Sequence, residues 1–180
     1  MGVTLQWRNE PTDRSERRFG LTVEFGGGAA RGTGYMSYSD RVGPGVVVVH
    51  DAFGLHDGIV SFCDQLNLEG FTVLAPDLYD GRVAESDEEA GALASELDDA
   101  RAGRRIGEAA AHLTANWHPR VGIVGLGSGA QLAASAADGS RPDALVAWGA
   151  EVRVECPFLC LDAASQAADE IVDFLRHNLS

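Results

Sequence analysis

The chain has 180 residues, 45% of them apolar, which is enough for one globular domain with its own core. Its net charge of −13 argues against a surface for nucleic acid or anionic membranes, because both require clustered Lys and Arg. No apolar run reaches the roughly 18 residues of a membrane span. The polar start does not resemble a secretory signal, and the three cysteines fit neither a disulfide framework nor a zinc site. We therefore expect a reduced, cytoplasmic protein.

The first half of the chain predicts a hairpin, two buried strands and a helix. Alternating apolar residues around a glycine-rich turn predict the hairpin. Continuous apolar runs predict strands buried on both faces, and helical apolar spacing that ends at Gly70 predicts the helix. In chain order these elements are a loose arm or edge strand at 1–19, hairpin strands at 21–25 and 33–39, a strand at 45–50, a helix at 58–70 and a strand at 71–77.

The second half alternates helices and strands. Ser86 and Glu89 form a capping-box pattern at the start of a helical stretch, which we expect Gly103 to break in two. The closing stretch has Ile171, Phe174 and Leu175 on one helical face. In chain order the predicted elements are helix at 86–117, a strand at 120–125, a helix to about residue 137, strands at 143–150 and 156–162, and a helix at 164–180.

This order predicts one α/β domain over residues 1–180, without a lid domain: a doubly wound, mostly parallel sheet with an antiparallel N-terminal hairpin. Ligands of such sheets bind where the parallel strands end at their carboxyl side. Those ends are marked by His50 and Asp51, residues 77–82, residues 125–129, Glu151 and Asp162.

Three segments together resemble the dienelactone hydrolase family of α/β-hydrolases. They are "GPGVVVVHDAFGLHDGIVSFCDQLNLEGFTVLAPDLYDGRVAE" (43–85), "VGIVGLGSGAQLA" (121–133), and the strands "ALVAWGA" and "CPFLCLD" before a final "VDFLRHNL" helix. The resemblance implies that "GLGSG" is the family's nucleophile elbow, with Gly127 in the nucleophile's place. It aligns Asp51 with an acid beside the nucleophile, the Ala52 and Ser128 amides with the oxyanion hole, and Arg82 with an arginine near the substrate carboxylate.

The resemblance also implies that the catalytic triad is missing. The position of the family's acid falls near Gln166, and Asp162 comes too early. The segment that carries the family's last strand and histidine has no counterpart, and His177 lies inside the final helix as a surface residue. We therefore expect a C-terminally shortened member. An exposed sheet edge at that end would invite pairing, which predicts a homodimer.

The stretch "HDAFGLHD" (50–57) concentrates acid–base groups at a strand end. We expect Asp51 to be a general base with His50 or His56 as its partner. Alternation along a strand would send His50 and Asp51 to opposite sides, so the sequence leaves the choice of histidine open. The spacing of the two histidines is not a standard metal-ligand spacing, and "GLGSG" is too short for a dinucleotide fingerprint. No metal or cofactor is expected.

The remaining candidates are substrate contacts and an anion site. Tyr79, Arg82 and Phe53 are predicted to contact the substrate. Trp148 is expected in the core or in the pocket wall, and Asp77 is expected to brace its loop. Ser128 is one residue late for a nucleophile, so we expect it to cap the following helix. Its amide, with that of Gly129, could bind an anion.

These residues favour an enzyme that uses a retained oxyanion hole for enolisation. Cyclisation, dehydration or isomerisation of a small carbonyl or lactone-type compound would follow, with secondary-metabolite tailoring as one setting. Two alternatives stay open. One is a non-catalytic pseudo-hydrolase that binds a small molecule or a protein. The other is an ester or lactone hydrolase that uses Ser128.

Overall fold

The computed structural model describes residues 20–28, 31–39, 43–116, 119–150, 156–161 and 168–180. Within these ranges the strands form one sheet in the order β1-β2-β4-β3-β5-β6-β7. The strands are β1 (Gly20–Phe25), β2 (Gly32–Ser37), β3 (Gly45–Val49), β4 (Thr72–Pro76), β5 (Val121–Leu126), β6 (Ala144–Trp148) and β7 (Phe158–Leu161). The arm at 1–19 lies outside the described residues.

The sheet is mostly parallel, as the alternating pattern predicts. β1 pairs antiparallel with β2, and β2 pairs antiparallel with β4. Strands β3 to β7 pair in parallel with their neighbours. After β3 the chain adds β4 on one side and β5 on the other, so the strand order reverses between β3 and β5. Ligands of open α/β sheets bind at such a switch point.

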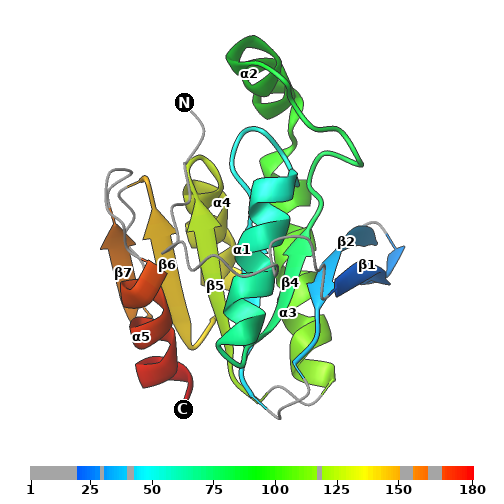
Figure 1. Ribbon diagram of the computed structural model, residues 1–180. Helices are drawn as coiled ribbons and strands as arrows, with labels where there is room; N and C mark the ends of the chain where they lie inside the picture. The colour runs from blue at the N-terminus through cyan, green and yellow to red at the C-terminus, as the bar shows by residue number, and fades with distance from the viewer. Residues whose placement is uncertain (1–19, 29–30, 40–42, 117–118, 151–155, 162–167) are drawn as a thin grey trace.

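Five helices accompany the described strands. They are α1 (Asp57–Leu68), α2 (Asp87–Glu96), α3 (Asp99–Ala115), α4 (Gly129–Ser140) and α5 (Ala168–Leu179). Helices α1 and α5 cover one face of the sheet and α3 and α4 the other, whereas α2 stands beyond the carboxyl ends of the strands (Figure 1). None of the helices in the described ranges has both the length and the apolar character of a membrane span.

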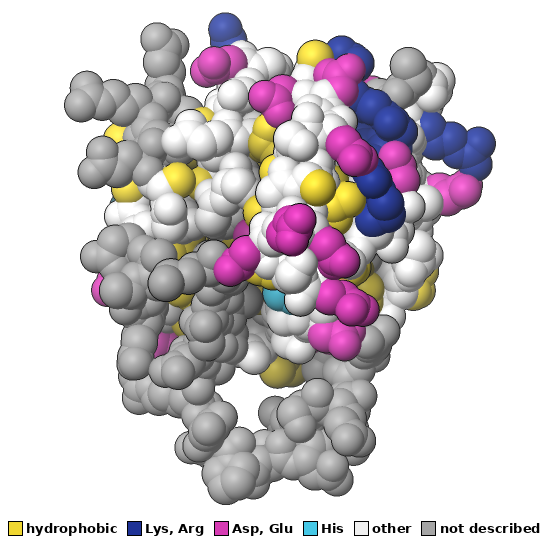
Figure 2. Space-filling view, turned by 90° about the horizontal axis from the view of Figure 1, so that it is seen from above, with side chains coloured by type: hydrophobic (Ala, Val, Ile, Leu, Met, Phe, Trp, Pro, Cys, Tyr) yellow, Lys and Arg dark blue, Asp and Glu magenta, His cyan; other side chains and the backbone are white. Residues whose placement is uncertain are grey.

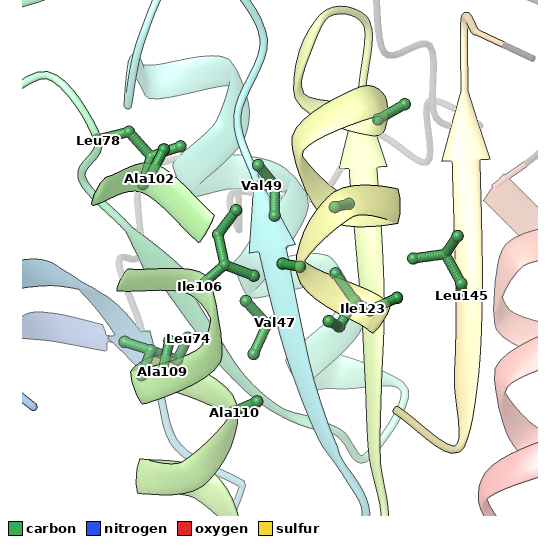
Figure 3. Close-up of a cluster of buried hydrophobic side chains, with 14 of the residues drawn as sticks. Val47, Val49, Leu74, Leu78, Ala102, Ile106, Ala109, Ala110, Ile123 and Leu145 are labelled. Carbon is green, nitrogen blue, oxygen red and sulfur yellow. The ribbon is translucent and has the colours of Figure 1, made fainter. Parts of the chain in front are cut away.

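Two core layers lie on either side of the sheet because successive strand residues point to opposite faces. Val47, Val49 and Ile123 face α3 and α4 in one cluster, together with Ile106 (Figure 3). Val46, Val48, Val124 and Val146 belong to the other cluster, against α1 and α5. The run "VVVV" therefore serves both cores, which is why it reads as continuously apolar.

Helix boundaries confirm most of the pattern and correct one prediction. Gly70 follows α1 with φ +99°, and the Ser86 side chain accepts from the Glu89 N–H at the start of α2. The predicted break at Gly103 is wrong, because Gly103 lies inside α3. The interruption comes at Leu97, whose backbone is extended, and Asp98 starts α3 by accepting from the Arg101 N–H. A strong N-cap therefore decides the boundary rather than a glycine.

At the C-terminal end, β7 forms an edge of the described sheet, and its Phe158 is 44% exposed. Ile171 and Leu175 of α5 are buried against the sheet, with Phe174 beside them. His177 is exposed, as expected. Pairing of two copies along the β7 edge remains a prediction.

A buried polar network ties α1 to the hairpin. Tyr35 of β2 donates its hydroxyl hydrogen to Asp64 of α1 at 2.7 Å, and Ser37 donates to the same oxygen at 2.9 Å. The Tyr35 hydroxyl also accepts from the Gly20 N–H at 2.9 Å. Burial raises the pKa of Tyr35, and the Asp64 carboxylate raises it further through its hydrogen bond and its charge. The folded protein therefore holds Tyr35 as the neutral phenol.

Tyr35→Phe should lower the free energy of unfolding by about 1–2 kcal/mol, since it removes the hydrogen bond to Asp64 and leaves the partly buried Gly20 amide without its acceptor. The effect should depend on alkaline pH. Because the folded-state pKa of Tyr35 is raised, its contribution is complete below the unfolded value near 10 and is lost as pH rises through the folded value. Denaturant unfolding at a series of alkaline pH values should show a shallower decline for Tyr35→Phe than for wild type. Equal slopes would mean that Tyr35 is not held neutral by the fold.

Candidate active site

The turn between β5 and α4 is a sharp elbow with Gly127 at its apex. Gly127 has φ +54°, a conformation that L side chains rarely adopt. Its N–H donates to the carbonyl of Trp148 at 2.7 Å, which fixes the turn against the end of β6. A strand, a strained apex and a helix in this order are the geometry of a nucleophile elbow. The apex carries no side chain.

The two outer glycines of "GLGSG" allow close backbone packing around that apex. A Cβ on Gly125 would lie 2.5 Å from the Ala130 Cα, and a Cβ on Gly129 would lie 2.2 Å from the carbonyl oxygen of His50. The second contact presses the start of α4 against the end of β3. The residue after His50 is Asp51, so the elbow and the "HDAFGLHD" loop meet at the switch point of the sheet.

Two backbone amides near the elbow have no hydrogen-bond acceptor within the described part of the chain. Neither the Ala52 nor the Ser128 N–H has an acceptor among the described residues. Ser128 occupies the N-cap position of α4, as expected, but its side chain makes no capping hydrogen bond. Its backbone is already helical, with φ −61° and ψ −28°, whereas a capping side chain needs an extended backbone to reach the next amides. Its exposed hydroxyl has no histidine as a hydrogen-bond partner among the described residues.

One carboxylate oxygen of Asp51 is hydrogen-bonded, and the other is buried without a hydrogen-bond partner among the described residues. The residue is 4% exposed. Oδ1 accepts from the Phe53 N–H at 2.9 Å and lies 3.5 Å from Nε2 of His56. Oδ2 is buried and has no hydrogen-bond partner in the described part of the chain. Burial raises the pKa of Asp51, but His56 and the Phe53 amide outweigh burial, so the net pKa lies below its usual value. Asp51 is therefore a carboxylate at neutral pH.

His56 faces Asp51 in a defined orientation. It is the N-cap of α1, with φ −83° and ψ 171°, and its Nδ1 accepts from the Gly58 N–H at 3.1 Å. An Nδ1 that accepts leaves Nε2 to carry the proton of the neutral ring, so an N–H faces the Asp51 carboxylate. Phe53 contacts the ring edge-on, with centroids 6.5 Å apart.

His50 lies beside this pair, but both of its ring nitrogens bond to backbone groups. Its Nε2 accepts from the Leu78 N–H at 3.1 Å, so its Nδ1 carries the proton and donates to the Asp51 carbonyl at 2.8 Å. It is 2% exposed, and burial lowers its pKa. The neutral ring thus joins the ends of β3 and β4. Of the two candidate histidines, the structure brings His56 to the Asp51 carboxylate.

The loop after β4 adds an aromatic wall and an outward-facing ion pair. Asp77 braces the loop by accepting from the Tyr79 N–H, as expected. Tyr79 packs edge-on against His50 with centroids 4.9 Å apart, and burial and the charge of Asp51 raise its pKa. Arg82 pairs with Glu96 of α2 at 2.7 Å, and its side chain is 55% exposed. No local sequence pattern predicts that ion pair.

Trp148 lies at the end of β6 and is 2% exposed. Its ring packs near Phe62 of α1, with centroids 6.5 Å apart. Its Nε1 is buried and has no partner among the described side chains and backbone. The candidate positions Glu151, Asp162 and Gln166 lie outside the described residues. Within the described ranges, no cluster of three His, Cys, Asp or Glu side chains could hold a metal ion.

Figure 2 looks onto the carboxyl ends of the strands. Acidic side chains are scattered over the described part of this face, with a histidine near its centre and basic side chains gathered at one side. The elbow and the facing loop thus both lie at the carboxyl ends of the strands, at the switch point of the sheet.

Comparison with known proteins accounts for this architecture. The model of the dienelactone hydrolase family matches residues 33–168. The chain belongs to the dienelactone hydrolase family. Protein usf of Aquifex pyrophilus is 35% identical over 85 residues, which are 46% of this chain and 37% of that protein. A relative from Aquifex aeolicus is 33% identical over 123 residues, which are 63% of this chain and 53% of that protein. The chain thus spans about half the length, or less, of these curated relatives.

Solved structures of dienelactone hydrolase-like proteins share the fold. A dienelactone hydrolase-like promiscuous phosphotriesterase from metagenomic libraries has a TM-score of 0.64 at 22% identity, covering 88% of this chain and 77% of that chain. Dienelactone hydrolase from Anabaena variabilis has a TM-score of 0.63 at 16% identity, covering 89% of this chain and 98% of that chain. The α/β-hydrolase fold is therefore shared.

Proposed function

We propose that this member of the dienelactone hydrolase family is an acid–base enzyme that works without a nucleophile at its elbow. Its substrate would be a small carbonyl or lactone-type compound. The observation that carries the proposal is the Asp51 carboxylate, buried and with a free Oδ2, whose Oδ1 lies 3.5 Å from Nε2 of His56. This pair stands beside an elbow whose apex is a glycine.

The proposed step is enolisation. Oδ2 of Asp51 is buried, so a substrate must first open a path to it. Oδ2 then takes a proton from the carbon next to the carbonyl, and the C–H electron pair becomes the C=C bond of an enolate. The carbonyl oxygen takes the negative charge, and the free amides of Ala52 and Ser128 stabilise it. The His56 N–H holds the other carboxylate oxygen. Return of the proton from Asp51 to the other carbon of an enediolate formed from a hydroxyketone gives isomerisation. A β-hydroxyl that takes this proton leaves as water, which gives dehydration. Attack of the enolate carbon on a second carbonyl of the same molecule opens its C=O π bond to an alkoxide, which takes the Asp51 proton, and gives cyclisation.

In this proposal the anchoring roles differ between Tyr79 and Arg82. Tyr79 is close enough to Asp51 for the carboxylate charge to raise the pKa of its hydroxyl, which supports a place beside the substrate. Arg82 already binds Glu96, so a substrate would have to displace that carboxylate. His50, with both ring nitrogens bonded to backbone groups, is assigned to positioning Asp51 rather than to proton transfer.

The test is exchange of α-hydrogens for deuterium in heavy water, followed by proton NMR. The panel consists of hydroxyacetone, γ-butyrolactone, a butenolide and cyclohexanone, each with and without the protein. Enzyme-dependent exchange with at least one compound is the expected result. Exchange at the uncatalysed rate for every compound, with unchanged amide spectra on addition, would overturn the proposal. Unchanged exchange with shifted amide signals would favour the non-catalytic binding protein.

Hydrolysis through Ser128 is tested separately. The Ser128 hydroxyl has no histidine partner among the described residues, and it stands one residue after the apex. We therefore expect no labelling by a serine-reactive fluorophosphonate. Labelling of wild type that disappears in Ser128→Ala would support an ester or lactone hydrolase instead.

A further inference from the structure

Gly58, at the second position of α1, lies directly under the His56 ring. A Cβ on Gly58 would be 2.8 Å from Cε1 and 3.0 Å from Nδ1 of His56. Real Cβ atoms essentially never come this close to another heavy atom, so a side chain at 58 would force the ring to move. At the same place, the Gly58 N–H donates to Nδ1. The absent side chain and the amide act together on one ring.

The ring has little room to move without losing a contact. Its Nε2 lies 3.5 Å from Oδ1 of Asp51, and Phe53 lies against its edge. Rotation away from a Cβ on residue 58 would separate Nδ1 from the amide and Nε2 from the carboxylate. The capping bond and the Asp51 contact are therefore coupled through Gly58.

We propose that Gly58 is a positioning residue: its lack of a side chain lets His56 cap α1 through Nδ1 while its Nε2–H faces Asp51. The role of the His56–Asp51 pair in catalysis rests on the function proposed above, but the placement of the ring by Gly58 does not. Alanine forms helices better than glycine. Gly58→Ala should therefore raise the helix propensity of α1 and at the same time disturb the contact between His56 and Asp51. A merely structural role for Gly58 would not produce the second effect.

The experiment compares Gly58→Ala with Gly107→Ala. Gly107 lies inside α3, and a Cβ there would meet nothing within 4 Å, so it controls for helix propensity. Carbon-detected NMR follows the titration of the Asp51 carboxyl. Amide hydrogen exchange follows residue 58. In wild type, burial raises the pKa of Asp51, but the contact with His56 and the Phe53 amide lower it by more, so the net pKa lies below its usual value.

In Gly58→Ala we expect the pKa of Asp51 to rise and the amide of residue 58 to exchange about fivefold to tenfold faster, the size of a lost N-cap. Thermal unfolding should not move to lower temperature. His56→Ala should show the same two local changes, and Gly107→Ala neither. An unchanged Asp51 titration together with an unchanged amide in Gly58→Ala would overturn the proposal.

The α-hydrogen exchange rate adds a readout that separates the two proposals. If Gly58→Ala shifts the Asp51 titration and wild type catalyses no exchange, the positioning role stands and the proposed function fails. If wild type is active and Gly58→Ala keeps full activity with an unshifted Asp51, the positioning role fails and the proposed function stands.

Discussion

Asp51→Asn is expected to lower the enzyme-dependent rate of α-hydrogen exchange by about 10²–10⁴-fold, the usual contribution of a general base. The fold should survive, because the Asn side-chain oxygen can still accept from the Phe53 N–H that now bonds Oδ1. What is lost is the negative charge and the proton-accepting Oδ2. Initial exchange rates at saturating substrate measure the effect, and the far-ultraviolet circular dichroism spectrum controls for folding.

His56→Asn is the matched comparison. Asparagine is among the best N-caps, so it can replace the Nδ1 acceptor for the Gly58 N–H while removing the group that faces Asp51. We expect a smaller loss of rate than in Asp51→Asn, since the base remains and only its partner is gone. A larger loss in His56→Asn would instead make His56 the proton carrier.

Gly129→Ala should lower the free energy of unfolding by about 3 kcal/mol, at the upper end of overpacking substitutions. A Cβ there would lie 2.2 Å from the His50 carbonyl oxygen and 2.8 Å from the Val49 carbonyl oxygen. Both neighbours are backbone atoms of a buried strand, so neither can move aside cheaply. Urea unfolding gives the free energy. The elbow should be displaced as well, with loss of exchange activity in any protein that remains folded.

Gly139→Ala in the same helix provides the control for Gly129. A Cβ at 139 meets nothing within 4 Å, so alanine should raise the free energy of unfolding by about 0.5–1 kcal/mol through helix propensity. Opposite signs for two identical substitutions in α4 would show that close approach to β3 decides the effect. Similar values for both would mean that α4 does not press on the end of β3.

The sheet could be predicted from the sequence because its signals are local and agree with one another. The "VVVV" run is buried on both faces, Gly70 has the positive φ of a helix-ending glycine, and the elbow spacing places its positive φ at Gly127. Each of these features follows from the backbone demands of a few adjacent residues. Because these signals are local, the sequence could also place the candidate residues at the ends of β3, β4 and β5.

The partners within the site could not be predicted, because they depend on contacts between loops. Which histidine meets Asp51 is decided by the Leu78 amide, which holds His50 from a different strand end. Glu96, the partner of Arg82, comes from a helix that stands away from the sheet. A signal for Gly58 was present, since a histidine two residues before a glycine at a helix start permits ring capping. That spacing alone does not show that the other nitrogen of the His56 ring faces Asp51, which depends on the position of the loop.

We propose that the chemistry takes place at the loop facing the elbow rather than at the elbow serine. The most direct measurement sets Asp51→Asn beside Ser128→Ala in the same α-hydrogen exchange assay, on the compound that wild type exchanges fastest. We expect Asp51→Asn to lose the enzyme-dependent rate and Ser128→Ala, which keeps its backbone amide, to retain most of it. Loss of activity in Ser128→Ala with retention in Asp51→Asn would instead place the chemistry at the serine.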